Sequence, residues 1–266
     1  MNSFENTLNQ LTRKWWFYLL IVIVMFSIPT ISQKPYDSRN TSQVIIAVMQ
    51  NALIYQYPAL FPVFKLIPIL IITLVFLFGE RFTRLFDIYT ALLLLFTAIF
   101  QNMAFTEQYG FVRLLGNQVV LGLLALLWIW EAIIKRNDFT PKKRPLWKYW
   151  VVPVAFLAFW FPIDGTTLQP DFSPLLIFTS EAGLTWCMMV PVILAVLILF
   201  EPEINQPLVR LTAFIGLMIA ILNILNWFAL SNSMWIGILH LPLLVLSIYA
   251  LVISLKKKAD ISAIPS

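Results

Sequence analysis

The chain has few side chains of the kinds that bind metals or carry out redox chemistry. Its 266 residues include one cysteine, Cys187, and one histidine, His240. A lone cysteine excludes an intrachain disulfide, a CxxC redox pair and a thiolate metal cage. A lone histidine cannot supply two imidazoles to one haem or build a His-rich zinc site. We therefore expect no cofactor and no metal site.

Motifs that mark common catalytic and nucleotide-binding sites are absent as well. The sequence contains no GxxxxGK[ST] phosphate loop, no HExxH zinc-binding helix, no GxSxG nucleophile elbow and no CxxCH haem attachment. No catalytic residue can be assigned from a motif.

Charged residues are scarce, at 12% of the chain against 60% hydrophobic residues, and the mean hydropathy is +0.84. A soluble domain with this composition would expose large apolar patches and aggregate. The fold class predicted from these values is all-α, a polytopic transmembrane helical bundle whose first partner is the lipid bilayer. Because the apolar segments leave little more than loops and tails, we expect no soluble catalytic domain and no nucleic acid partner.

Eight apolar segments are long enough to cross a bilayer, which takes about 20 helical residues for roughly 30 Å of hydrocarbon. They lie near residues 15–32, 61–79, 86–105, 110–134, 147–163, 178–200, 208–230 and 234–255. A further segment, 43–57, would reach only about 22 Å as a helix and is followed by Pro58, so it predicts a short interfacial or re-entrant helix. The whole chain, 1–266, is predicted to be a single integral membrane domain.

The basic residues are distributed unevenly between the two sides of these spans. With the N-terminus in the cytoplasm, only Lys34, Arg39, Lys65 and Arg113 of the 18 lysines and arginines fall outside the cytoplasmic set. Loops that remain in the cytoplasm carry an excess of Lys and Arg. The distribution predicts an integral protein of the cell membrane or inner membrane with both termini in the cytoplasm.

Polar residues within the predicted spans gather in the half of the membrane opposite the cytoplasm. Ionisable groups in hydrocarbon cost about 2.5 to 3.5 kcal/mol each, so Lys65 is also expected to face protein or water. The inner halves are predicted to be almost purely apolar, with Glu131 as an exception that extends towards Lys135. The residues predicted to line an outward-facing polar site are Glu181, Asn223, Asn226, His240, Asn117 and Gln118.

Three functions are compatible with this pattern. The first is a membrane protein that binds a small solute, an ion or a partner segment at the outward-facing site, as a transport-related protein or a membrane subunit of a complex. The second is a membrane-embedded enzyme that acts on a lipid or quinone at the outer leaflet, with Glu181 and His240 as acid and base. The third is a structural or assembly subunit, in which the polar residues serve as hydrogen bonds between helices.

Overall fold

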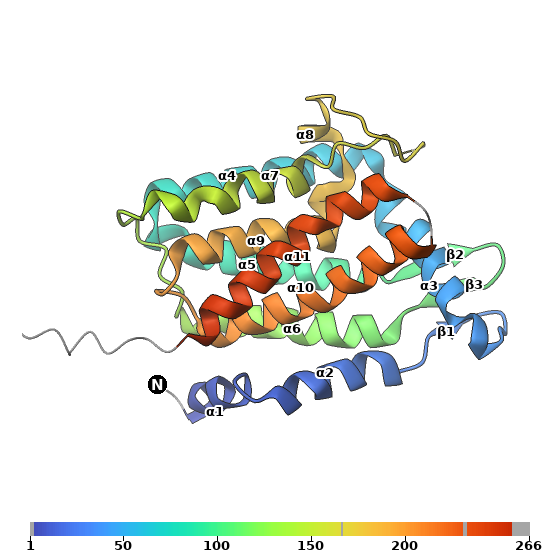
Figure 1. The fold of residues 1–266 in the computed structure, drawn as a ribbon, viewed down its shortest axis with the longest axis horizontal. Coiled ribbons are helices and arrows are strands. Elements are labelled where there is room, and N and C mark those ends of the chain that lie inside the picture. The colour runs from blue at the N-terminus through green and yellow to red at the C-terminus, as the bar shows by residue number, and fades with distance from the viewer. Residues whose placement is uncertain (1–2, 166, 231–232, 257–266) are drawn as a thin grey trace, which may run out of the picture.

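The computed structural model describes residues 3–165, 167–230 and 233–256 and shows a bundle of antiparallel helices (Figure 1). Its principal helices are α2 (Trp15–Ser27), α4 (Phe61–Phe78), α5 (Glu80–Phe100), α6 (Leu115–Ile134), α7 (Val151–Trp160), α9 (Trp186–Phe200), α10 (Gln206–Leu225) and α11 (Met234–Leu255). The first helix, α1 (Ser3–Leu11), and the last turn of α11 lie at one end, and a small β-sheet lies at the other. We call these the terminal end and the sheet end.

Five of the described helices are long and apolar enough to cross a membrane, and a bent pair of helices raises this number to six. The prediction of an all-α membrane bundle is therefore supported, whereas the count of eight spans is not confirmed. Two predicted spans correspond to helices of fewer than 18 residues, at Trp15–Ser27 and Leu146–Trp160. The second of these consists of the 3₁₀ turn η4 (Leu146–Trp150) followed directly by α7.

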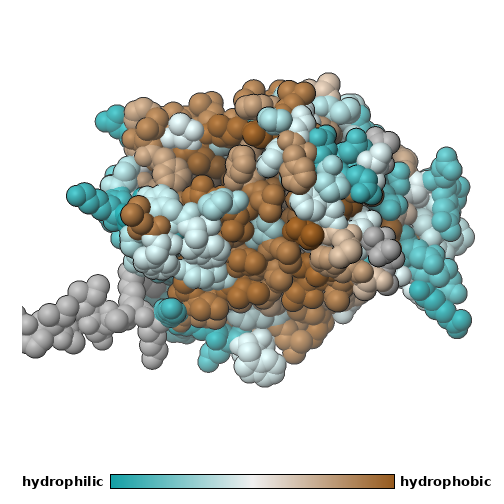
Figure 2. Space-filling view, turned by 45° about the horizontal axis from the view of Figure 1, so that its top comes forward, coloured by the Kyte–Doolittle hydropathy of each residue, from teal (hydrophilic) through white to brown (hydrophobic). Residues whose placement is uncertain are grey.

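The surface of the bundle matches this assignment. Figure 2 shows hydrophobic residues over the middle of the visible face and hydrophilic residues at its two ends. Large apolar side chains such as Leu70, Leu92 and Leu126 are exposed on the outside of the helices. An apolar band between polar ends is the surface that a lipid bilayer covers.

A three-stranded antiparallel sheet at the sheet end was not predicted. It consists of β1 (Ile31–Ser32), β2 (Met103–Thr106) and β3 (Gly110–Arg113) in the order β1-β3-β2. The predicted spans 15–32, 86–105 and 110–134 are therefore too long, because their helices end at Ser27 and Phe100 or begin at Leu115. A hydropathy pattern cannot distinguish a short apolar strand from the last turns of an apolar helix.

The predicted interfacial helix is also shorter than expected. Helix α3 (Thr41–Gln50) follows the 3₁₀ turn η1 (Ser38–Asn40) and packs on the sheet through Val44 and Val48. After it, the chain continues through the 3₁₀ turns η2 (Leu53–Tyr55) and η3 (Pro58–Leu60). The amide of Asn51 donates to the Ala47 carbonyl at 2.9 Å and closes the last turn of α3. The remainder of the predicted 43–57 segment is 3₁₀ turn and loop, and it leads into α4.

Helix α9 forms the centre of the bundle, where the other helices surround it (Figure 1). All 15 of its residues are buried. A helix that is apolar on every side must be enclosed by protein or lipid, and in this fold protein encloses it. Any group carried at either end of α9 is therefore held within the bundle.

Candidate functional site

The chain breaks sharply just before the central helix. The segment Leu176–Leu184, which contains α8 (Leu176–Thr179) and the 3₁₀ turn η5 (Glu181–Leu184), meets α9 at an angle of 97°. Ser180 and Thr185 have extended backbones with ψ values of 157° and 123°, so each interrupts the helix. The predicted span 178–200 is thus two helical pieces, with Glu181 placed at the break.

A glycine allows the broken segment to lie directly on α4. A Cβ atom added to Gly183 would come within 2.6 Å of the Phe64 carbonyl oxygen and 3.0 Å of the Lys65 backbone nitrogen. Only the absence of a side chain permits this contact between two backbones. Gly183 therefore fixes the position of η5, and with it that of Glu181.

Polar side chains from four parts of the chain surround the break, and we call them the helix-break cluster: Tyr55, Gln101, Glu181, Cys187 and Asn223. The Gln101 amide oxygen accepts a hydrogen bond from the Trp186 backbone nitrogen at 3.0 Å. The Asn223 amide nitrogen lies 3.5 Å from the Cys187 sulfur. Two predicted residues, Glu181 and Asn223, are thus in the cluster.

Tyr55 shows how close these groups are to one another. Burial raises the pKa of its phenol well above the ordinary value, and the neighbouring Glu181 and Cys187 side chains raise it further. A hydrogen bond with Gln101 offsets part of this rise in pKa. Sequence reasoning missed Tyr55 because it follows the short helix α3 in a turn, outside every predicted span.

The carboxylate of Glu181 has no partner within the part of the chain that the structure describes. It makes no hydrogen bond and no ion pair there, and the residue is partly exposed. A carboxylate normally accepts several hydrogen bonds when it is ionised. Glu181 is therefore the group of the cluster with free capacity to bind a ligand.

A buried lysine lies on α4 at the point where η5 packs against that helix. Lys65 is fully buried, donates a hydrogen bond to the Phe159 carbonyl and has its Nζ 4.1 Å from the Phe159 ring centroid. No described carboxylate forms an ion pair with it. A carbonyl oxygen and an aromatic face are therefore the described partners of this amino group, in place of a counter-ion.

No hydrogen bond or ion pair in the described part of the chain joins Glu181 to the other predicted residues. The His240 Nδ1 atom pairs with the Ile236 carbonyl at 2.8 Å, and no hydrogen bond joins His240 to Glu181, so the predicted acid and base pair is not formed. Asn226 opens the π-helical turn η6 (Asn226–Leu230) that continues α10. Asn117 is half-buried in the first turn of α6.

Gln118 belongs to a separate contact at the sheet end. Its amide oxygen accepts a hydrogen bond from Arg113 at 3.2 Å, and its amide nitrogen donates to the Ile99 carbonyl at 3.3 Å. These bonds join β3, α5 and α6. The role that the structure gives Gln118 is to hold elements together.

A second buried polar group lies at the terminal end, in the helix halves that were predicted to be almost purely apolar apart from Glu131. Glu131 is fully buried and accepts hydrogen bonds from the backbone nitrogens of Arg136 and Asn137, at 2.7 and 2.6 Å, and from the Asn205 amide at 2.5 Å. It does not extend towards Lys135, because Lys135 has a positive φ of 54° that ends α6. The reversed chain brings the next two N–H groups back onto the carboxylate.

Asn137 connects this carboxylate to another on the neighbouring helix. Its amide nitrogen donates to Asp87 at 2.8 Å, and its amide oxygen accepts from the Asn205 backbone nitrogen at 2.9 Å. We call Asp87, Glu131, Asn137 and Asn205 the terminal-end network. It joins α5, α6, the loop after α6 and the turn before α10.

The described residues contain no group of three or more His, Cys, Asp or Glu side chains placed to hold a metal ion. The helix-break cluster instead offers one carboxylate, two amides, a phenol and a thiol. Such a set can bind a cation or a neutral solute through hydrogen bonds and charge. The chain matches no protein-family model, and comparison with curated proteins and with solved structures finds none that is similar.

Proposed function

We propose that this chain is a multi-pass membrane protein that binds a small cation or hydrogen-bonding solute at the helix-break cluster, in a transport-related role. The observation that carries the proposal is the partly exposed Glu181 carboxylate, which has no partner among the described residues. A cationic or hydrogen-bond-donating ligand would supply the missing interaction. The amides of Gln101 and Asn223 would orient it.

The broken helix supports a transport-related role. Discontinuous membrane helices recur at the binding sites of transporters, because their ends expose backbone groups and helix dipoles inside the bundle. Here the break lies within a bent pair of helices that is long enough to cross a membrane only when its two pieces are combined. Glu181 and Cys187, on either side of the break, both lie near the Tyr55 phenol.

The proposed topology has eight crossings, with both termini in the cytoplasm and the sheet end outside. The beginning of α1 and the end of α11 lie at the same end of the bundle, as an even number of crossings requires (Figure 1). Exposed basic residues such as Lys14, Lys135 and Lys143 follow or precede helices at this terminal end. The positive-inside rule favours a cytoplasmic location for it.

Cys187 provides a direct test, because it is the only cysteine and lies in the cluster. We expect water-soluble methanethiosulfonate reagents, added outside proteoliposomes or cells, to label it slowly. Glu181→Gln should lower the labelling rate of a cationic reagent relative to an anionic one by about fivefold, which corresponds to about 1 kcal/mol of charge interaction. Tetramethylammonium, used as a probe cation, should slow labelling of the unmodified protein.

The matched control for this experiment is Glu107→Gln. Glu107 is an exposed acid at the same end of the bundle, in the turn between β2 and β3. It should leave the ratio of the two labelling rates unchanged. Labelling only from the cytoplasmic side, or an equal effect of both substitutions, would contradict the proposal.

An enzyme that uses Glu181 and His240 together is less well supported, since no hydrogen bond joins them. If Cys187 is not labelled from either side and no solute changes its labelling, the protein is better described as a purely structural subunit.

A further inference from the structure

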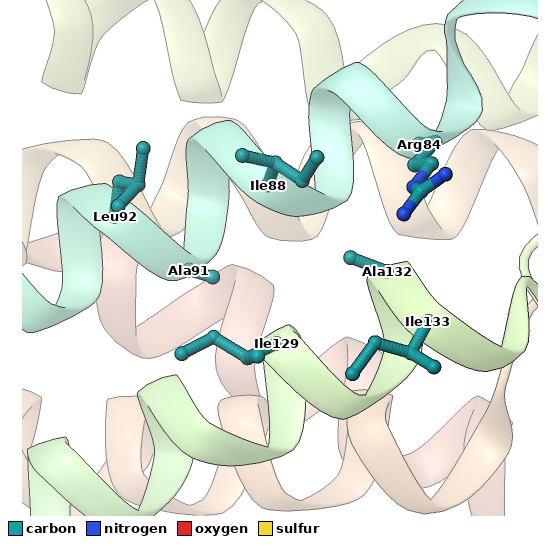
Figure 3. A pocket seen from close by; sticks show the side chains of 7 residues that line it. All are labelled: Arg84, Ile88, Ala91, Leu92, Ile129, Ala132 and Ile133. Atoms are coloured by element: carbon teal, nitrogen blue, oxygen red, sulfur yellow. The ribbon is translucent and has the colours of Figure 1, made fainter.

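A shallow groove runs between α5 and α6 on the outside of the bundle, near the terminal end. It encloses about 170 Å³. Figure 3 shows the lining side chains, which come from α5 on one side and α6 on the other. They are Arg84, Ile88, Ala91, Leu92, Ile129, Ala132 and Ile133.

The shape of the groove follows from the sizes of these side chains. Ala91 and Ala132 are 2% and 4% exposed and form its floor, so the two helices approach closely there. Leu92 and Ile133 are 59% and 67% exposed and form its rims. An apolar channel with a floor of small residues and branched or long aliphatic walls accommodates a flexible hydrocarbon chain.

One charged residue stands at the end of this channel. No described residue forms a hydrogen bond or an ion pair with the Arg84 guanidinium, which lies beside the groove (Figure 3). Glu80 is one helical turn earlier, yet it does not pair with Arg84 either. The guanidinium therefore has free capacity for a bidentate anion such as a phosphate.

The depth of Arg84 matches that of a lipid headgroup. It lies four residues after the start of α5, about 6 Å along the helix, whereas Leu92 lies about 12 Å further into the apolar band. The groove thus runs from the edge of the bilayer towards its centre. The leaflet at this end is the cytoplasmic one in the proposed topology, and anionic lipids concentrate there.

We propose that the α5–α6 groove binds an anionic phospholipid, with its phosphate on Arg84 and an acyl chain between Ile88, Leu92, Ile129 and Ile133 over the two alanines. A helix from a partner protein would fill the apolar part and leave the guanidinium without an anion. The proposal depends on the membrane placement of α5 and α6. It is independent of solute binding at the helix-break cluster.

Native mass spectrometry of the purified full chain in detergent micelles tests the proposal. Phosphatidylglycerol should bind more tightly than phosphatidylcholine with the same acyl chains. Arg84→Gln should weaken the binding of phosphatidylglycerol by about fivefold, the effect of about 1 kcal/mol for one basic residue at a membrane surface, and leave phosphatidylcholine unchanged. Arg84→Lys keeps the charge but loses the bidentate geometry, so it should bind phosphatidylglycerol more weakly than the unmodified protein and more tightly than Arg84→Gln.

Lys143→Gln is the matched control, because Lys143 is an exposed cation in a loop at the same end and away from the groove. It should leave both affinities unchanged. Equal binding of the two lipids to the unmodified protein overturns the proposal. An equal loss of affinity for phosphatidylglycerol in Lys143→Gln and Arg84→Gln also overturns it. Both variants replace exposed side chains, so a folding defect is not expected to obscure the comparison.

Discussion

Replacing Glu131 with leucine is expected to lower the free energy of unfolding by about 4 kcal/mol. The substitution removes the acceptor for two backbone N–H groups and for the Asn205 amide. The bond from the Asn137 nitrogen is buried and the other two are partly buried. Each unsatisfied buried donor costs about 1 to 3 kcal/mol, and local rearrangement recovers part of the sum. Reversible unfolding in mixed micelles of sodium dodecyl sulfate and dodecyl maltoside measures this loss.

Glu131→Gln should be much milder, at about 1 kcal/mol. The remaining amide oxygen still accepts from the backbone nitrogens of Arg136 and Asn137, and rotation of the Asn205 amide presents its oxygen to the new NH₂ group. The control Glu203→Leu removes an acid whose side chain pairs with exposed Lys142 at 3.2 Å and should cost less than about 1 kcal/mol. If Glu131→Leu lowers the free energy of unfolding no more than Glu203→Leu does, the Glu131 carboxylate does not organise the terminal end.

The same network explains why the loop after α6 has a defined course. Asn137 uses its backbone nitrogen for Glu131 and both ends of its amide for Asp87 and Asn205. A loop residue that bonds to three other segments holds the terminal ends of α5, α6 and α10 in fixed relative positions. In the proposed topology, this rigid end would be the cytoplasmic one, and the site at the helix break would lie at the opposite end.

Hydropathy and length predicted the all-α bundle and its long apolar helices, because a bilayer-spanning helix needs a long apolar run and few other segments have one, but the predicted count of eight spans is not confirmed. They could not predict the sheet at the sheet end. Its longer strands span only Met103–Thr106 and Gly110–Arg113, and apolar residues such as Met103 and Phe105 read as the continuation of a helix. β2 and β3 pair with each other, and β3 also pairs with β1, which is distant in sequence.

The polar residues at the terminal end were missed for a different reason. Thr83, Asp87 and Thr90 recur at intervals of four and three residues, so they share one face of α5, and all three are buried. Averaging the hydropathy over α5 hides this polar face because apolar residues such as leucine and phenylalanine dominate the rest of the helix. A search for polar residues at helical spacing would have found it, although not the loop residue Asn137 that binds Asp87.

At the helix break, sequence reasoning found the charged residue but not its surroundings. An ionisable side chain at the start of an apolar run identified Glu181, and its depth associated it with Asn223. The contribution of Tyr55 and the pairing of His240 with the Ile236 carbonyl depend on how the chain folds, which spacing along single helices does not encode. The short 3₁₀ turn that carries Glu181 is likewise set by the contact between Gly183 and α4.

Two glycines on one helix are expected to respond in opposite directions to the same substitution. Gly116→Ala should lower the free energy of unfolding by about 3 kcal/mol, because the added Cβ would lie 1.9 Å from the Met25 carbonyl oxygen and 2.9 Å from its carbon. Both atoms belong to the backbone of α2, so no side-chain rotation relieves the clash and the two helices must separate. Helix α2 is short, and this close approach is part of what holds it to α6.

Gly122→Ala is the control, because nothing lies within 4 Å of the added Cβ. Alanine has the higher helix propensity by up to about 1 kcal/mol, so this variant should be as stable as the unmodified protein or more stable. Unfolding in mixed micelles compares the stability of the two variants. The rate of proteolysis between α1 and α2 provides a second measure, of how readily α2 separates from α6. Equal free energies of unfolding for the two variants would mean that α2 does not contact α6 at Gly116. Other contacts, such as that between Tyr18 and Phe214, would then have to hold α2 in the bundle.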